Sequence, residues 1–508
     1  MAAAASFGLY LGNTSACLAI YKDDNVDVVA NDAGDRVTAA VVAFNDSEKV
    51  IGLAAKTGLF RNGPVSVLNN KRLMNKDIDD VELELAINNS PSKLVKESDE
   101  LRYLIKKREK NEKISPVEVS TMIFEAMYNI STTAAHDDDE HNVVLCAPLR
   151  FSAESLKTWS ESATAAGFRV LQVISEPAAT CIAYGIGQNK KKSELILVYR
   201  IGGVTSEVTL IRVAGGTYTV LSTRYYSKLG GNKLTRILAE YLAGEFRNKY
   251  KLDPTESRRS MSKLNNAAET CKHVLSTMST AHCFVESLND GVDFSHNITR
   301  ARFENLIGPS ISEYIGPIDE ILQDSKYSHS DINKVVLCGG TMKIPKLQEK
   351  ISLLFPNAET VSNKWSPDET MAIGAAMQSA LLISHRMHDR ELNSMSVEVH
   401  SLDRSLCVQF GEADPIVIPA GTIVPIKIQT IVEIPKVNDN KVDVKIFEGG
   451  SDDLKDTRKI GLISLKAESG EKFKVDTDLT EANLNVNIVE MKSGKKSSFR
   501  FGIHEDDS

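Results

Sequence analysis

Two glycine-bearing turns hold the residues whose types and spacing are best suited to chemistry. The first lies within residues 196–210, ILVYRIGGVTSEVTL, where an apolar strand leads into Gly202 and Gly203 and a second strand leaves the turn. Glycine has no Cβ atom, so the backbone N–H groups of such a turn can approach an anion closely. Thr205 adds a hydroxyl donor beside the turn. This combination predicts contact with a phosphate group.

The same arrangement occurs again near the N-terminus. Residues 7–19 read FGLYLGNTSACLA, with Gly12 at the turn and Asn13 and Thr14 directly after it. A single glycine-bearing hairpin more often binds nothing, but two of one type in two halves of a chain predict two related lobes. We expect these lobes to close on one phosphate-bearing ligand.

A third glycine turn connects a strand to a helix. Residues 335–347, VVLCGGTMKIPKL, run through Gly339 and Gly340 into a helix that begins near Pro345. Proline suits the first helical turn because its missing N–H is not needed there. A strand-to-helix turn of this kind can hold a nucleotide on its backbone amides.

The elements that must position these turns alternate between strands and helices. Strands are predicted over 142–147 and 170–174, and helices over 153–166 and 178–184. Such alternation indicates an α/β lobe. A further amphipathic helix, over 116–133, begins after a serine N-cap with proline in its first turn.

The pattern changes after residue 384. Residues 389–401 are polar and are interpreted as a linker, whereas nearly everything from 406 to 503 alternates with period two. This predicts a compact antiparallel β-sandwich of about a hundred residues. We expect no helical segment after it.

Composition narrows the class of protein. The 508 residues are too many for one core and predict about two to four domains. The formal net charge of −8 argues against a surface that binds nucleic acid directly. Seven cysteines without a C-x-x-C pair indicate reduced thiols in the cytosol and no zinc site. No apolar run is long enough to span a membrane, and the N-terminus lacks the basic region of a signal peptide.

Two charged runs have plain interpretations. The lysine-rich residues 106–113 are interpreted as a solvated hairpin or loop, with nucleic-acid contact as the weaker alternative. The acidic residues 137–140 are interpreted as exposed, because a metal site needs ligands that converge and a linear run rarely supplies them.

Motifs along essentially the whole chain resemble those of the heat shock protein 70 family of chaperones. They occur in the family's order and spacing: LGNTS at 11–15, NDAGDR at 31–36, NNKRL at 69–73, SEPAAT followed by AYG at 175–185, IGGVTSEV at 201–208, LGG at 229–231, CGGTMKIPKLQ at 338–348 and SPDE followed by GAA at 366–376. The β part also matches, at KIFEGG (445–450) and ANLNVNIVEMKSGK (482–495). The resemblance implies a two-lobed, actin-like α/β ATPase domain over 1–384, a linker over 385–401 and a truncated substrate-binding-type β-sandwich over 402–508, without a helical lid.

The resemblance also implies an ATP site. Lys71 matches the family's catalytic lysine, Glu176 its cleft glutamate, and Thr205 keeps a hydroxyl. No metal ligand is assigned. Residues 269–276 match the family's adenosine-binding helix, and the alternative interpretation is a charged surface helix without a role in binding. The positions that match nucleotide-binding residues are Gly12, Asn13, Thr14, Gly202, Gly203, Gly230, Gly231, Glu269, Lys272, Ser276, Gly339, Gly340, Thr341, Lys343 and Asp368.

Two departures from the family pattern bear on the chemistry. The family places an aspartate before each of the first two turns, where this chain has Tyr10 and Arg200. In the family these carboxylates hold the water shell of Mg²⁺, which keeps several waters and relies on carboxylates to fix them. Phosphoryl transfer depends on positioning and electrostatic stabilisation, so their loss should impair hydrolysis more than binding. We expect very slow or absent hydrolysis of ATP and direct pairing of Arg200 with phosphate oxygens. The need for Mg²⁺ stays open.

A truncated, hydrolysis-impaired member resembles one subgroup of the family, the member 14 proteins of animals and the Ssz-type proteins of fungi. The resemblance implies a cytosolic heterodimer with a zuotin-type J-domain protein, the ribosome-associated complex, which helps a conventional family member act on nascent polypeptides. The acidic net charge favours attachment to the ribosome through the partner over direct RNA contact. Two rival hypotheses stay open: an autonomous ATP-hydrolysing peptide-binding chaperone, and a sugar or metabolite kinase, which the β-sandwich counts against.

Overall fold

The chain divides into two compact units, residues 1–390 and 391–508. The predicted linker lies mostly outside the described residues, as do three residues of each charged run. The computed structural model describes residues 5–46, 48–97, 100–107, 111–135, 140–187, 193–214, 217–362, 364–388, 405–413, 415–418, 426–434, 441–449, 458–479 and 483–502.

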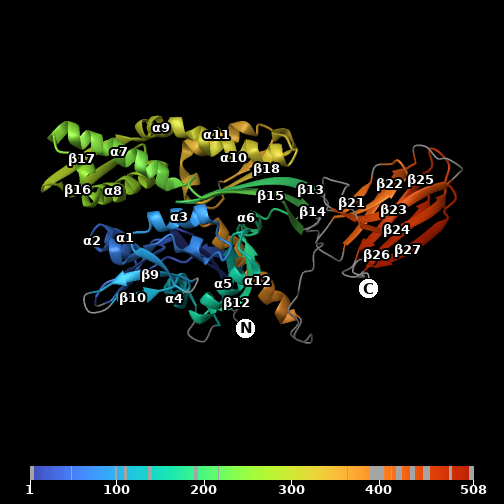
Figure 1. Cartoon of the computed structure of the whole chain (residues 1–508), viewed down its shortest axis with the longest axis horizontal. Helices are drawn as coiled ribbons and strands as arrows, with labels where there is room; N and C mark the ends of the chain where they lie inside the picture. Colours follow the sequence, from blue (N-terminus) through green and yellow to red (C-terminus); the bar gives the residue numbers. More distant parts are fainter. Residues whose placement is uncertain are drawn as a thin grey trace. The chain divides into compact units, whose positions relative to one another are not determined.

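Unit 1 consists of two lobes, each built around one mixed sheet (Figure 1). The first sheet has the order β12-β11-β1-β2-β3 and the second has the order β15-β14-β13-β18-β19. In both sheets an antiparallel meander is joined on one side to two parallel strands. The shared order confirms the two related lobes that the repeated turns predicted.

The first lobe carries the N-terminal turn between β1 and β2. Its strands are β1 (Ser6–Leu11), β2 (Ser15–Lys22), β3 (Asn25–Val28), β4 (Thr38–Ala39), β5 (Val41–Phe44), β6 (Lys49–Ile51), β7 (Ser66–Leu68), β8 (Lys93–Glu97), β9 (Glu100–Lys106), β10 (Asn111–Ile114), β11 (Asn142–Ala147) and β12 (Arg169–Ser175). Its helices are α1 (Leu53–Thr57), α2 (Leu59–Asn62), α3 (Asp80–Asn89), α4 (Pro116–Ala134), α5 (Ala153–Ala165), α6 (Glu176–Ala183) and α12 (Thr370–His388). Helix α4 begins at the predicted cap, because the Ser115 hydroxyl accepts a hydrogen bond from the Glu118 N–H.

The second lobe carries the turn between β13 and β14. Its strands are β13 (Ser193–Ile201), β14 (Ser206–Ala214), β15 (Thr217–Tyr226), β16 (Thr280–Asn289), β17 (Val292–Thr299), β18 (Lys334–Cys338) and β19 (Glu359–Val361). Its helices are α7 (Gly231–Tyr250), α8 (Arg258–Thr277), α9 (Arg300–Ile307), α10 (Ile311–Asp324) and α11 (Pro345–Leu354).

Helix α12 packs closely on both β1 and α6. A Cβ atom at Gly8 of β1 would lie 2.0 Å from the backbone nitrogen of Ala376, and one at Gly374 would lie 1.8 Å from the carbonyl oxygen of Ala179. Both distances are far below any real contact, so only glycine permits this packing. The two glycines thereby fix the strand that ends at the first turn.

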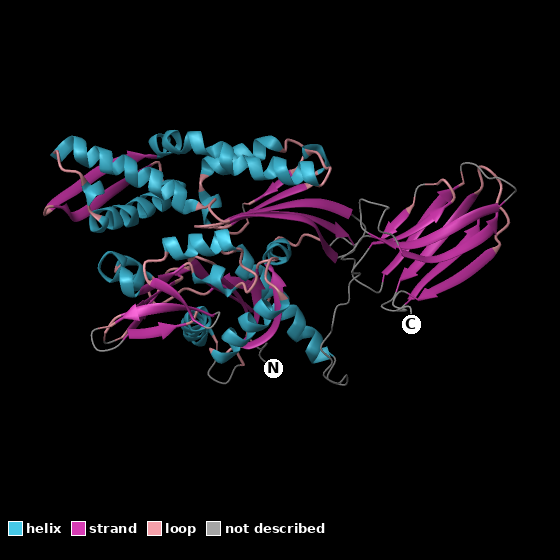
Figure 2. Ribbon diagram, in the orientation of Figure 1, coloured by secondary structure: helices cyan, strands magenta, loops and turns pink. Residues whose placement is uncertain are grey.

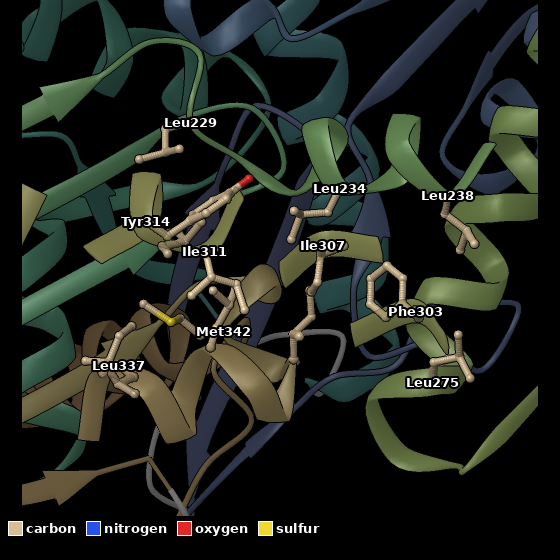
Figure 3. Close-up of a cluster of buried hydrophobic side chains, with 14 of the residues drawn as sticks. Leu229, Leu234, Leu238, Leu275, Phe303, Ile307, Ile311, Tyr314, Leu337 and Met342 are labelled. Atoms are coloured by element: carbon tan, nitrogen blue, oxygen red, sulfur yellow. The ribbon is translucent and has the colours of Figure 1, made fainter. Parts of the chain in front are cut away.

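The core of the second lobe supports the loop before α7. Leucine, isoleucine and phenylalanine side chains from α7, α8, α9 and α10 belong to the same buried core as Tyr314 (Figure 3). The Tyr314 hydroxyl donates to the carbonyl of Gly230 at 2.9 Å, and its own carbonyl accepts from the Tyr199 hydroxyl at 2.8 Å. The buried core therefore holds the glycine pair at residues 230–231 in place.

Unit 2 is a β-sandwich, as the period-two pattern predicted. Its sheets have the orders β21-β20-β23-β24 and β22-β25-β26-β27, all antiparallel, and side chains from both sheets form one apolar core. Its described part contains strands and no helix (Figure 2). The strands are β20 (Ser405–Phe410), β21 (Ile416–Ile418), β22 (Ile426–Glu433), β23 (Lys441–Gly449), β24 (Arg458–Lys466), β25 (Lys472–Leu479), β26 (Asn483–Glu490) and β27 (Lys496–Gly502).

Two further sequence expectations concern helices and thiols. No helix within the described ranges combines the length and the apolar character needed to cross a bilayer. All seven cysteines are free thiols, and six of them are buried.

Candidate functional site

The two predicted turns have the same backbone hydrogen bond and face each other. In each, the turn glycine donates its N–H to the carbonyl three residues later, at 2.7 Å for Gly12 and 2.9 Å for Gly202. A Cβ atom at Gly203 would lie 2.6 Å from the side chain of Thr14. Any larger residue at 203 would push the two lobes apart, so the close approach of the turns requires glycine.

Tyr10 and Arg200 fill the space beneath the turns. The Tyr10 hydroxyl lies 2.9 Å from the position that a Cβ atom of Gly12 would take. The Nη1 atom of Arg200 lies 3.2 Å from the corresponding position at Gly202. Both side chains are buried. An aromatic ring and a guanidinium therefore occupy the places next to the predicted phosphate turns.

Arg200 belongs to a chain of buried charges. Lys71 Nζ donates to Glu176 Oε1 at 2.5 Å, and the ammonium group also lies 4.7 Å from the centre of the Tyr10 ring. Arg200 Nε lies 2.8 Å from Glu176 Oε2 as an ion pair, although its N–H is not aligned for a hydrogen bond. Arg200 Nη2 lies 3.4 Å from Glu207 Oε2, its direct neighbour across the β13–β14 pair. The carboxylate of Glu176 thus lies between two cations.

The pKa shifts of these groups follow from burial and neighbouring charge. Burial alone raises the pKa of Glu176, but Lys71 and Arg200 outweigh burial and hold that pKa below the ordinary glutamate value. Burial lowers the pKa of Lys71, and Glu176 offsets part of that effect. Burial raises the pKa of Glu207, which Arg200 only partly reverses. The lowered pKa of Glu176 keeps its carboxylate negatively charged between Lys71 and Arg200.

The sequence assigned Arg200 to phosphate oxygens, and the structure shows the guanidinium paired with Glu176 and Glu207. A buried guanidinium needs a counter-charge, and a glutamate lies directly opposite it on β14. Arg200 therefore reaches a phosphate only by exchanging one carboxylate for another anion.

The space between the turns is small. The cavity has a volume of about 10 Å³, which holds about one water molecule. A triphosphate therefore requires the lobes to move apart before it enters. The residues that line the cavity are Tyr10, Asn13, Lys71, Pro148, Arg150, Glu176, Arg200, Thr205 and Tyr225.

These residues fit an anion better than a hydrated magnesium ion. Three cations, Lys71, Arg150 and Arg200, line the cavity beside the amide-rich turns. The available carboxylates, Glu176 and Glu207, already pair with lysine and arginine. Across the parts of the chain that are described, no group of three or more histidine, cysteine or acidic side chains is arranged to hold a metal ion. Mg²⁺ prefers oxygen ligands that are not already paired, so the donor set does not suit it.

The third turn contacts the second through a side-chain hydrogen bond and close backbone packing. The Thr341 hydroxyl donates to the Gly202 carbonyl at 2.9 Å, and the Gly231 N–H donates to the same oxygen at 3.0 Å. Gly339 has a φ angle of +88°, and a Cβ atom there would lie 2.4 Å from the carbonyl oxygen of Ile201. Glycine at 339 is therefore required both by the φ angle and by the close approach to β13.

Lys343 and Asp368 meet beside this third turn. Lys343 Nζ lies 2.7 Å from Asp368 Oδ2, while Asp368 Oδ1 accepts a hydrogen bond from the Ser366 hydroxyl. A Cβ atom at Gly340 would lie 3.8 Å from the Cβ atom of Asp368. The structure thus brings the predicted residues of the second and third turns together.

The predicted residues on α8 differ in their surroundings. Lys272 Nζ donates to the Thr235 hydroxyl at 2.7 Å and to the Gly231 carbonyl at 3.2 Å. Burial lowers the pKa of Lys272 to about 8. Because Lys272 is only 6% exposed, the alternative of a charged surface helix does not hold for it.

Glu269 and Ser276 lie on either side of Lys272 along α8. Glu269 pairs with Lys56 of the first lobe at 2.9 Å, so this end of the helix faces the other lobe. The Ser276 hydroxyl donates to the carbonyl of His273 in its own helix. Ser276 therefore lies on the expected helix, but its hydroxyl bonds to its own helix and not to the glycine turns.

Sequence reasoning missed part of this site. Arg150 and Tyr225 line the same cavity, and the carboxylate of Glu82 contacts both. Arg150 stands just beyond a proline that ends a buried strand, and that position was the one available signal. Neither Glu82 nor Tyr225 belongs to a recognisable motif.

Comparisons with known proteins agree with this architecture. The family model described as Hsp70 protein matches residues 6–500. "Heat shock 70 kDa protein 14" of Xenopus tropicalis is 36% identical over 500 residues, which cover 97% of this chain and 98% of the relative. The proteins of the same name from Bos taurus and Homo sapiens are each 37% identical over 505 residues, with the same coverage. The chain therefore belongs to the Hsp70 family of chaperones, whose nucleotide-binding domain binds ATP.

Proposed function

We propose that this chaperone binds ATP and hydrolyses it very slowly or not at all. The observation that carries the proposal is the chain Lys71–Glu176–Arg200, which closes over Tyr10 between the two glycine turns. ATP would be held by Lys71 and Arg200, by the amides of the turns at Gly12 and Gly202, and by the adenosine-side residues that follow. Bound ATP would supply the negative charge that these cations receive from glutamates in the structure.

Chemistry at the γ-phosphate needs an attacking water held in one orientation. In this cleft Glu176 accepts from Lys71 and contacts Arg200, so its two oxygens are both engaged. Tyr10 stays protonated, since burial raises its pKa well above the ordinary value, and a protonated phenol is no base. Neither Glu176 nor Tyr10 is therefore left to place the water, which supports binding without turnover.

We further propose that the protein acts in the cytosol with a zuotin-type J-domain partner, as a heterodimer that reaches the ribosome through that partner and assists nascent chains. Support comes from the similarity to heat shock 70 kDa protein 14 over nearly the full length. The acidic net charge of −8 supports contact with the ribosome through a partner. Magnesium would not be required for nucleotide binding.

A pull-down with the full chain as bait tests the partner proposal. We expect one J-domain protein at stoichiometric level together with ribosomal proteins, and loss of the ribosomal proteins alone when the extract is depleted of that J-domain protein. A bait that recovers substrate proteins in an ATP-dependent manner and no stoichiometric J-domain protein would favour the autonomous chaperone instead.

A further inference from the structure

Glu82 is a buried carboxylate that accepts hydrogen bonds from side chains of both lobes. It lies in the first turn of α3 and is 1% exposed. Its Oε1 atom accepts from the Tyr225 hydroxyl at 2.6 Å and from Arg150 Nη2 at 3.1 Å, while Arg150 Nη1 contacts Oε2. Arg72 Nη2 lies 3.4 Å from the same carboxylate. Hydrogen bonds to a charged acceptor are stronger than neutral ones, so this set is a strong one.

The contacts cross from one lobe to the other. Glu82, Arg72 and Arg150 belong to the first lobe, whereas Tyr225 is the penultimate residue of β15 in the second. The guanidinium carbon of Arg150 lies 3.9 Å from the centre of the Tyr225 ring, which is a close cation–π contact. Arg72 Nη2 also donates to the carbonyl of Ser227 at 3.0 Å. Burial raises the pKa of Tyr225 to about 12, so its hydroxyl keeps the proton that it donates to Glu82.

Two of these four residues also form part of the wall of the candidate ATP site. Arg150 and Tyr225 line the cavity that also contains Lys71, Glu176 and Arg200. Because that cavity holds about one water molecule, a triphosphate enters or leaves only when the lobes separate. Separation on this side must break the Tyr225–Glu82 hydrogen bond and the stacking of Arg150 on Tyr225.

A second interlobe ion pair, Lys56–Glu269, joins α1 to α8. Its side chains are 27% and 22% exposed, whereas that of Glu82 is 2% exposed. Water can replace part of an exposed ion pair as it opens, but a buried carboxylate loses its partners outright. Opening is therefore expected to be limited on the side of Glu82.

We propose that Glu82, Arg150 and Tyr225 form an interlobe clasp that holds the cleft closed and limits the rate at which nucleotide enters and leaves. This inference rests on the proposed binding of ATP and goes beyond it, because it names the residues that set retention time. Glu82 and Tyr225 act as positioning residues: the clasp stabilises closed lobes with or without ligand. Loss of the clasp should therefore speed association and dissociation together and change Kd little.

The test uses the full chain and a fluorescent ATP analogue in stopped-flow binding and chase experiments. Tyr225→Phe keeps the ring on Arg150 and removes only the hydroxyl that donates to Glu82. Its dissociation rate is expected to rise about tenfold, the effect of one hydrogen bond to a charged group. Tyr225→Ala, which also loses the stacking, is expected to release nucleotide faster still, with an association rate raised in parallel.

Tyr226→Phe is the matched control. Its hydroxyl donates to Glu320 of α10 at 2.6 Å, and both residues lie within the second lobe. This variant loses the same chemical group from the next residue and is expected to leave both rates unchanged. Equal dissociation rates for Tyr225→Phe and Tyr226→Phe would overturn the clasp, as would a rise in Kd that matches the rise in dissociation rate.

Hydrogen exchange of the protein without nucleotide separates the clasp from the proposed function. If the lobes are clasped, residues 222–228 exchange faster in Tyr225→Phe than in Tyr226→Phe. Failure of the wild-type chain to bind the analogue would refute ATP binding and leave this comparison decisive for the clasp. Equal exchange in the two variants would refute the clasp whatever the chain binds.

Discussion

Replacement of Glu176 by glutamine is expected to lower the free energy of unfolding of unit 1 by about 3–5 kcal/mol, the usual cost of removing one partner from a buried ion pair. Glu176 is the carboxylate between Lys71 and Arg200, and all three side chains are buried. Glutamine keeps the shape and removes the charge, so two cations are left close together with only Glu207 as counter-charge. Few single substitutions on this chain should have a larger effect.

Denaturant unfolding followed by tryptophan fluorescence measures this effect. Both tryptophans of the chain, Trp159 and Trp365, lie in unit 1, so the signal reports on the unit that contains the substitution. The matched control is Glu161→Gln, which removes the same charge from an exposed pair with Lys157 and should cost at most about 1 kcal/mol. A Glu176→Gln variant as stable as this control would show that the buried chain of charges is not formed.

The double substitution Tyr10→Asp with Arg200→Asp is expected to make the protein depend on magnesium. It removes the Arg200 cation and adds two carboxylates beside Glu176 and Glu207, with Lys71 and Arg150 as the remaining positive charges that line the cavity. Like charges in a buried site repel and destabilise the fold, and Mg²⁺ with its bound waters relieves the repulsion. The melting temperature in EDTA should fall well below that of the wild type and recover in MgCl₂.

Bound Mg²⁺ is expected to raise the free energy of unfolding of the double variant by about 2.7 kcal/mol when the free Mg²⁺ concentration is about a hundred times its Kd. Magnesium-dependent hydrolysis of ATP should appear in the same variant. Arg236→Asp, a charge reversal on the exposed face of α7, should respond to neither EDTA nor MgCl₂. If the double variant is equally indifferent to magnesium, Tyr10 and Arg200 do not occupy the place of metal anchors.

Local sequence was sufficient to predict the turns and the elements around them. Glycine at 203 and 339 marks places where a Cβ atom would collide with another part of the chain, and such glycines are visible in the sequence. Period-two alternation after residue 405 identified the β-sandwich because alternating side chains face one buried core. These features are encoded within a few residues of one another.

The closure of the site could not be predicted in the same way. Glu82 is 68 residues from Arg150 and 143 from Tyr225, and an acidic residue in the first turn of a helix is usual for electrostatic reasons alone. Arg200 looked available for phosphate because Glu176, which approaches it from another element, is 24 positions earlier. Side-chain contacts between the lobes depend on the fold as a whole, and no local sequence pattern predicts them.

The central claim is tested most directly by single-turnover measurement on the wild-type chain. Protein in excess over radiolabelled ATP is incubated with MgCl₂ or with EDTA, and bound ATP and ADP are quantified over time. The account predicts that ATP binds in both conditions and is recovered intact, with no more ADP than the protein-free blank. Magnesium-dependent conversion of the bound ATP to ADP above that blank would contradict it.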